Sequence, residues 1–113
     1  MRLKSEIWVR AYLRVCQADN VPAVIVQRGD AAAGAIFICV DRLDGTVDLY
    51  GPAPAGFAGG ETDRRWVNCL GQTPVLREDA NRYLLRQREF DPDLWIVEIE
   101  DRAGRHFLGD AAG

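Results

Sequence analysis

The sequence predicts an α+β domain in which two helices pack on a mainly antiparallel sheet of about four to five strands. Three observations lead to this class. Apolar residues recur at helical spacing near the N-terminus and again before Phe90, short β-branched runs lie between and after these segments, and Asp44-Gly45 separates two of the runs. The chain has 113 residues, the length of one domain, so we assign residues 1–113 to a single globular unit.

The first helix is expected from Ser5 to about Ala18. Ser5 is a favoured N-cap residue, and the polar positions that follow, such as Arg10, fall on one stripe while apolar residues fill the other face. The pattern indicates an amphipathic helix lying on an apolar surface. We expect it to end at Asn20, because asparagine tolerates the left-handed conformation of a helix C-terminus.

Three strands are expected next. Residues 23–26 are apolar and mostly β-branched, which predicts a buried strand that reaches Arg28. Residues 35–40 are apolar on both faces, which predicts a central strand with material on each side that continues to Leu43. Asp44-Gly45 is the sequence of a two-residue type I′ turn. Residues 46–50 then return as the second strand of a hairpin, with Val47 and Leu49 facing one way and Asp48 the other.

The second half of the chain predicts one more helix and one firm strand. Residues 51–60 are rich in Gly and Pro and predict a flexible loop, and residues 65–70 predict a short strand, with a helical turn as the alternative. Thr73 followed by Pro74 predicts a helix start, and the helix should end at Phe90, before Asp91-Pro92. Its expected inner stripe is Leu76, Ala80, Tyr83, Leu84 and Gln87. Residues 94–100 predict a strand, residues 101–104 a turn, and residues 106–108 a brief return pairing.

Composition and charge exclude several classes of function. The net charge of −3 disfavours nucleic acid as a partner, and the longest apolar runs are too short to span a membrane. Cys16, Cys39 and Cys69 are widely spaced and lie among apolar residues, which favours buried free thiols over a disulfide framework or a zinc site. Charged residues follow the N-terminus too early for a signal peptide, so we expect a bacterial cytoplasmic protein. We also expect no metal and no cofactor.

Few residues are candidates for catalysis. His106 is the only histidine, and it has no nucleophile near it in the sequence, which favours an exposed or edge-packed imidazole. Glu98 and Glu100 share one face of a predicted strand and could form an acid/base pair if buried, although a strand with one buried face more simply turns them to water. The sequence therefore favours a protein that is not an enzyme, without deciding the point.

One basic cluster is a candidate ligand site. Arg64 and Arg65 precede Trp66, and paired guanidinium groups beside an indole suit an anionic or aromatic group. The Gly-rich loop before them could act as a lid with Phe57 as its apolar tip, although it lacks the ending of a phosphate-binding loop. The alternative is a strand start that buries Trp66 in the core.

Four strings carry a resemblance to a known family. They are KSEIWVRAYL at 4–13, RGD at 28–30 with GAIFI at 34–38, LYGP at 49–52, and the stretch from Arg88 through FDPDLW at 90–95 to EIED at 98–101. In these the chain resembles an uncharacterised alphaproteobacterial family, a domain of unknown function known as DUF1491. The resemblance spans almost the whole chain and is weakest over residues 53–63. It implies a compact bacterial cytosolic protein of this length, and it brings no activity, substrate or catalytic residue.

Two functions from different classes follow from these observations. The first is a non-catalytic binding or protein-interaction module, with an unknown protein partner or self-association as a homodimer. The alternative is a small enzyme or ligand-binding domain for an anionic metabolite, in which Arg64, Arg65 and Trp66 hold the anion beneath the Gly-rich loop and Glu98 or His106 carries a proton. A nucleic-acid role ranks third.

Overall fold

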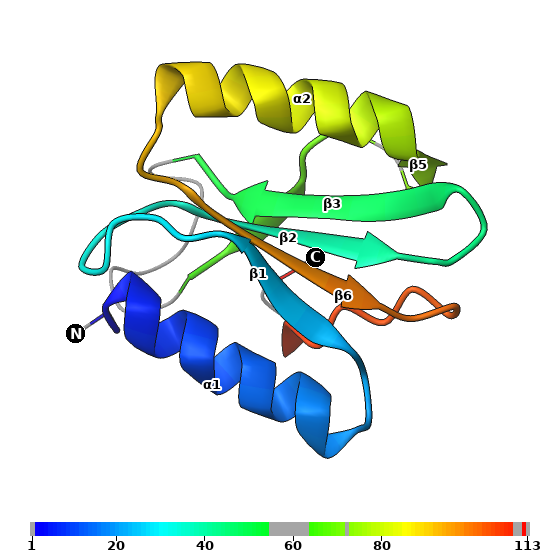
Figure 1. The fold of residues 1–113 in the computed structure, drawn as a ribbon, viewed down its shortest axis with the longest axis horizontal. Coiled ribbons are helices and arrows are strands. Elements are labelled where there is room, and N and C mark those ends of the chain that lie inside the picture. The colour runs from blue at the N-terminus through cyan, green and yellow to red at the C-terminus, as the bar shows by residue number, and fades with distance from the viewer. Residues whose placement is uncertain (1, 55–63, 72, 110–111, 113) are drawn as a thin grey trace.

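The computed structural model describes residues 2–54, 64–71, 73–109 and 112, and in this part of the chain two helices cover opposite faces of one sheet (Figure 1). The elements are α1 (Ser5–Ala18), β1 (Ala23–Gln27), β2 (Ile36–Asp41), β3 (Thr46–Pro52), β4 (Trp66–Asn68), β5 (Val75–Leu76), α2 (Arg77–Phe90) and β6 (Trp95–Glu100). The strand order is β1-β6-β2-β3-β4, and β5 pairs with the same strand as β4, namely β3. The α+β class is confirmed, with six strands, slightly more than expected.

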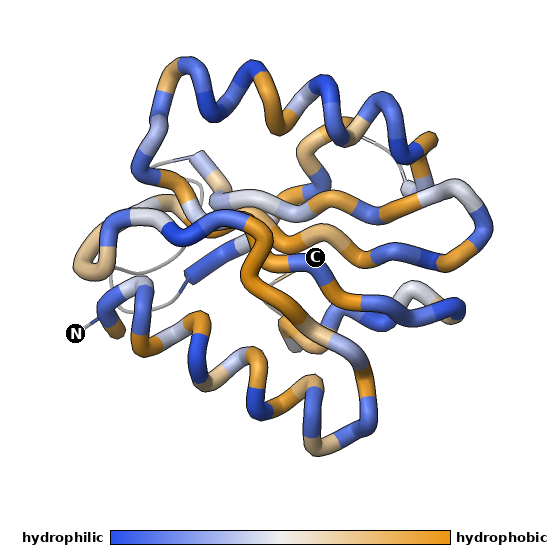
Figure 2. Tube along the Cα trace, viewed as in Figure 1, coloured by the Kyte–Doolittle hydropathy of each residue, from blue (hydrophilic) through white to orange (hydrophobic). Residues whose placement is uncertain are grey.

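Strand β2 is central, as predicted, and one of its pairings was not foreseen. It pairs antiparallel with β3 and parallel with β6, while the other paired strands are antiparallel. Its apolar side chains point alternately into two hydrophobic clusters. One cluster packs under α1 and includes Ile38 and Val97, and the other packs under α2 and includes Leu49 and Leu84. Figure 2 shows hydrophobic residues gathered along the strands between the two helices.

The prediction of a buried strand at residues 23–28 is wrong for one face. In β1, Ala23 and Ile25 pack on the cluster under α1, but Val24 and Val26 are each 57% exposed. The physical reason is coverage, because α2 packs on β3 and β5, away from β1. Strand β1 is an edge strand, and no helix covers the face that carries Val24 and Val26.

The hairpin of β2 and β3 is confirmed, but its turn is not of type I′. Positive φ angles occur at Leu43 (64°) and Gly45 (91°), so the two positions are not adjacent. The Arg42 amide donates to the Thr46 carbonyl at 3.1 Å, which closes a three-residue loop. The Asp44 carboxylate accepts from both the amide and the hydroxyl of Thr46, at 2.9 and 2.6 Å. Side-chain capping by Asp44 therefore replaces the backbone geometry expected from the Asp-Gly pair.

The bounds of α1 and the end of α2 are confirmed, whereas the capping role of Ser5 and the predicted start of α2 are wrong. Ser5 lies inside α1 rather than capping it, and its hydroxyl donates to the Gly34 carbonyl at 2.7 Å. Helix α2 starts at Arg77 instead of Pro74, because Val75 and Leu76 are extended and pair with β3. Leu76 is consequently exposed and does not join the inner stripe, whereas Ala80 and Leu84 are buried.

The segment after β6 turns as expected but does not form the expected pairing strand. Residues 106–108 run as irregular chain, and Phe107 and Leu108 pack against the cluster under α1. The Tyr12 hydroxyl fixes this segment by donating to the His106 carbonyl at 2.7 Å. Most of the predicted 51–60 loop, including Phe57, lies outside the described residues. Neither described helix has the length and apolar character needed to cross a bilayer.

Candidate functional site

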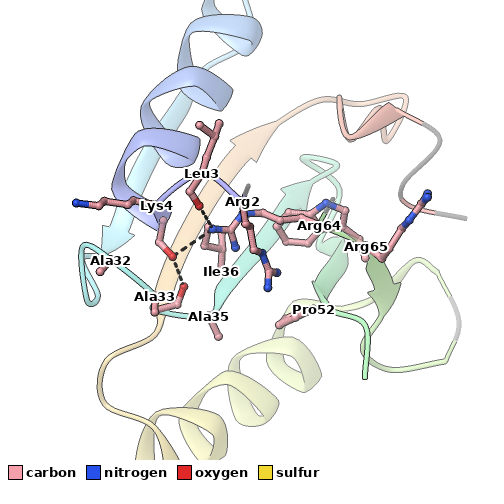
Figure 3. Close-up of a pocket in the computed structure, with 13 residues that line it drawn as sticks. Arg2, Leu3, Lys4, Ala32, Ala33, Ala35, Ile36, Pro52, Arg64 and Arg65 are labelled. Carbon is pink, nitrogen blue, oxygen red and sulfur yellow. Dashed lines mark hydrogen bonds between the residues drawn. The ribbon is translucent and has the colours of Figure 1, made fainter. Parts of the chain in front are cut away.

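A cavity of about 300 Å³ lies where the start of α1 approaches the sheet (Figure 3). Three segments that are distant in the sequence form its walls, namely residues 2–5, residues 32–36 and residues 64–66, and Pro52 at the end of β3 completes it. The cavity thus depends on the packing of the sheet rather than on one local motif.

The loop from Gly29 to Gly34 forms the wall between α1 and β2. The Asp30 carboxylate accepts from the amides of Ala32 and Ala33, at 3.2 and 2.8 Å, which gives the loop its turn. The first amides of α1 donate to carbonyls of this loop, Ser5 to Ala32 at 3.2 Å among them. Because these amides are already bonded, the start of α1 offers the cavity little of the anion affinity that a bare helix N-terminus has.

Arg64 crosses from the β4 side to the start of α1. Its Nη2 donates to the Leu3 carbonyl at 2.9 Å and lies 3.4 Å from the Ser5 hydroxyl (Figure 3). Its guanidinium carbon lies 6.0 Å from the centre of the Trp8 ring. Its Nε is buried and has no hydrogen-bond partner among the described residues. A buried N–H without an acceptor is costly, and because this atom is enclosed by protein it does not face the cavity.

The electrostatics of the cavity are one-sided. Four of the lining residues are cationic, namely Arg2, Lys4, Arg64 and Arg65, and none is Asp or Glu. Within the described ranges, none of the four forms an ion pair with a carboxylate. Burial, and next the positive charge of Arg2, lower the pKa of Arg64. An arginine remains charged in proteins, so the described lining residues give the cavity a net positive charge.

The structure brings three of the four predicted site residues to this cavity. Arg64 points toward the start of α1, whereas the Arg65 side chain extends away from it (Figure 3). Trp66 is only 5% exposed and stacks near Trp8, with ring centroids 5.0 Å apart, so it is also a core residue, as the alternative interpretation proposed. Phe57 lies outside the described residues.

Sequence reasoning missed the residues that the fold adds to the cluster. Arg2, Lys4 and the small residues at 32–35 line the same cavity. They lie far from Arg64 in the sequence, and no local pattern marks them as its neighbours. Only the approach of α1 to β4, carried by the Trp8–Trp66 contact, places them together.

The other candidate groups lie elsewhere. Glu98 forms an ion pair with Arg77 at 2.8 Å, and Glu100 is exposed. The His106 ring packs edge-on against Tyr50, and its Nδ1 accepts from the Leu108 amide at 2.9 Å. Neither His106 nor Glu98 lines the basic cavity. The predicted acid/base groups therefore do not converge on the arginine cluster.

The three cysteines are free thiols in poorly reactive surroundings. Cys16 and Cys39 are buried, and Cys69 is half-buried. Burial raises the pKa of Cys39 to about 12 and that of Cys69 to about 11, so both are protonated at neutral pH. In the described part of the chain, no three His, Cys, Asp or Glu side chains are grouped as a metal site requires.

A second cavity, of about 380 Å³, lies between β4 and α2 and differs in charge. Its lining combines apolar residues with polar ones such as Tyr83, Gln87 and Asp91, and no Arg or Lys is among its described lining residues. The only charged group among these described residues is the Asp91 carboxylate, which repels anions. The two cavities share Ala35 and Pro52, and only the first is basic.

Comparison with known proteins gives consistent results. The model of the family described as "Protein of unknown function (DUF1491)" matches residues 3–109. The crystal structure of a DUF1491 family protein from Caulobacter crescentus is 37% identical, with a TM-score of 0.81, covering 100% of this chain and 99% of that chain. The solution structure of protein Atu0922 from A. tumefaciens is 43% identical, with a TM-score of 0.76, covering 89% and 87%. No curated protein matches the chain.

Proposed function

Since the chain belongs to the DUF1491 family, which is described only as proteins of unknown function, we propose a function from the cavity itself: a non-catalytic module that binds a small organic anion. The observation that carries the proposal is the set of four cationic residues that line one cavity, with no carboxylate among its described lining residues. A bound anion would compensate their mutual repulsion and accept charge-assisted hydrogen bonds from guanidinium groups at the cavity wall.

The cavity also limits the size and character of the ligand. At about 300 Å³ it is at the small end of ligand pockets, which begin at roughly 300 Å³. Its floor is apolar, with Ile36, Pro52 and Trp66 beside small alanines. We therefore expect a compact molecule with one carboxylate or phosphate group and a small apolar part. Guanidinium groups bind both kinds of anion through paired N–H donors.

The lining residues favour binding over catalysis. Acid–base or nucleophilic chemistry needs a group that accepts a proton at neutral pH, and the described residues of the lining include neither His, Asp, Glu nor Cys. The one hydroxyl, on Ser5, is buried and already donates to Gly34. The cavity can therefore hold and orient an anion, and its residues give no route to a covalent or proton-transfer step.

A ligand screen with one matched pair of variants tests the proposal. Small carboxylates and phosphates are added to the purified protein, and the melting temperature and tryptophan fluorescence are recorded, since Trp66 lines the cavity. A ligand at about one hundred times its Kd stabilises by about 2.7 kcal/mol, which is roughly a 10 °C rise in Tm for a domain of this size. Arg64→Met removes the charge and keeps the aliphatic stem, and should abolish the shift.

Arg88→Met is the matched control, because Arg88 is an exposed arginine on α2, which lies on the opposite face of the sheet (Figure 1). It changes the net charge by the same amount and should leave the ligand shift intact. The proposal fails if no anion of either class stabilises the wild-type protein. It also fails if Arg88→Met weakens binding as much as Arg64→Met, since the effect would then be one of net charge.

We propose a cytoplasmic location for the module, because its three cysteines are free thiols. Recovery of the protein from a secreted or membrane fraction of cells would contradict this. We also propose that nucleic acid is not its partner, since the net charge of −3 repels phosphate backbones. Tight binding of DNA or RNA at low salt would contradict that part.

A further inference from the structure

Strand β1 lies at one end of the sheet, and β4 lies at the other. In the described part of the chain, β1 pairs only with β6. At the other side, β4 and β5 both pair with β3, and Trp66 of β4 forms a further bridge to Ala112. Figure 1 shows β1 at the front of the sheet, next to β6 and well away from α2. An uncovered edge strand is a template for pairing with another strand.

The orientation of the free backbone groups follows from the ladder with β6. The Glu100 amide donates to the Pro22 carbonyl at 3.0 Å, and the register then pairs Ala23 with Ile99 and Val24 with Glu98. Residues of an antiparallel strand alternate between facing their partner and facing away. Val24 therefore bonds toward β6, while the amides and carbonyls of Ala23 and Ile25 point to the open edge.

The side chains of β1 leave an apolar row beside this edge. Val24 and Val26 are each 57% exposed on the face that α2 leaves uncovered, and no residue of β1 is charged. Natural edge strands are commonly protected by lysine, proline, an inward-pointing charge or a β-bulge. Strand β1 has no lysine, proline or charge within its bounds, and its ladder with β6 is regular up to Ile25 and shifts register between Ile25 and Gln27. The nearest charge, Arg28, is already paired with Glu6 at 2.8 Å.

From this edge we infer that β1 pairs antiparallel with β1 of a second copy of the chain, which forms a homodimer with one continuous sheet. A two-fold axis at Ile25 makes the two Ile25 residues exchange both backbone hydrogen bonds. It also places Val24 of each copy opposite Val26 of the other, at the close positions of an antiparallel ladder. The exposed valines thereby cover one another on both sides of the axis.

A second copy fits this edge because the strand is complementary to itself. The occupant must be an extended, uncharged segment with β-branched residues at alternate positions, and β1 has this sequence. Self-pairing also brings no like charges together at the axis, because the strand is neutral and Arg28 is engaged by Glu6. This surface is separate from the basic cavity, whose lining includes no residue of β1.

Sedimentation over a range of micromolar concentrations tests the inference. The wild-type chain should be a dimer, and Val24→Lys or Val26→Lys should raise the dissociation constant at least about tenfold, because a buried lysine at the axis lacks a partner. Both valines are exposed in the single chain, so these variants should fold normally. Leu85→Lys is the matched control: Leu85 is 57% exposed on α2, which packs on β3 and β5, and this variant should stay dimeric.

Amide hydrogen exchange tests the register. Exchange at Ile25 should slow as the protein concentration rises, whereas exchange at Val24 should be slow at every concentration, because that amide bonds to β6. In Val24→Lys, the Ile25 amide should exchange fast throughout. A monomer at every concentration overturns the inference, and so does a dimer that survives both lysine variants. Pairing of this edge only with a peptide from another protein overturns it as well.

Discussion

The ion pair of Arg42 and Asp48 lies inside the fold, and its removal should be far more costly than that of a surface pair. Asp48 is completely buried in β3, and Arg42, just after β2, is 25% exposed at its side chain. Both contacts reach the same oxygen, with Nε and Nη2 of Arg42 at 3.0 and 2.9 Å from Oδ2. Oδ1 has no partner among the described residues. Among the described residues, Arg42 therefore supplies the positive charge that neutralises the Asp48 carboxylate.

The expected loss of unfolding free energy on removing Arg42 follows from the complete burial of Asp48. Removing one partner of a buried pair typically costs 3–5 kcal/mol, because the remaining charge is buried without compensation. Arg42 is partly exposed, so water can replace some of its contacts, and we expect Arg42→Met to cost about 3 kcal/mol of unfolding free energy. The double variant Arg42→Met/Asp48→Leu removes both charges, and it should recover most of this loss.

Urea unfolding followed by tryptophan fluorescence measures these differences, and the chain offers a matched control. Arg82 and Asp79 form an ion pair on α2 at 3.3 Å, with side chains 62% and 48% exposed. Exposed pairs contribute about 0–1 kcal/mol, so Arg82→Met should change stability little. If Arg42→Met costs no more than Arg82→Met, or if the double variant is no more stable than Arg42→Met, the argument from burial is refuted.

Three further predictions concern single positions. Gly34→Ala should lower the unfolding free energy by about 1–3 kcal/mol in urea, because an added Cβ would lie 2.5 Å from the Asp93 carbonyl oxygen; an unchanged stability would contradict the packing described. Ser5→Ala should cost about 1 kcal/mol in the same assay, since the Gly34 carbonyl loses its donor, and a cost near zero would mean that the bond contributes nothing. Burial raises the pKa of Cys39 from 9.0 to about 12, so the thiol ionises first in the unfolded chain. The unfolding free energy should therefore be constant below about pH 9 and fall above it, by about 2 kcal/mol near pH 10.5. Cys39→Ala should show a smaller fall, and an equal fall would refute this cause.

Local sequence signals predicted those parts of the fold whose causes are local. Asn20 does adopt positive φ (59°) after α1, and α2 ends at Phe90, before Asp91-Pro92. The two-faced apolar run of β2 became the centre of the sheet. Each of these features is decided by the conformational preference or the burial of a few adjacent residues, which is the information that a sequence pattern contains.

The failures share a different cause, which is competition from tertiary contacts. Ser5 has the chemistry of an N-cap, but the Gly34 carbonyl is a better placed partner for its hydroxyl than the helix amides. Pro74 could begin a helix, but pairing of Val75 with β3 delays the start to Arg77. The apolar run of β1 indicated burial, and its exposure depends on which strands α2 covers. None of these contacts can be found from adjacent residues.

The candidate site shows the same division. Arg64, Arg65 and Trp66 were found because they are adjacent in the sequence, and their cavity exists because distant segments meet them. The sequence also suggested a proton carrier at Glu98 or His106. Arg77 and the Leu108 amide hold those two side chains elsewhere, which is why the proposal is one of binding.

Strand β6 lies between β1 and β2 and is parallel to β2, and this position accounts for both proposed surfaces. By taking that place, β6 leaves β1 at the edge of the sheet. Residues just before and at the start of β6 also hold the loop that forms the cavity wall, an arrangement that we call the Asp30 clamp. The Asp93 carbonyl accepts from the Asp30 amide at 2.8 Å, and the Trp95 Nε1 donates to the Asp30 carbonyl at 2.8 Å. Gly34→Ala disturbs this clamp and should weaken anion binding as well as stability. Val24→Lys changes only the edge, so it should abolish dimerisation while leaving anion affinity unchanged, and a joint loss of both in that variant would show that the two surfaces are not independent.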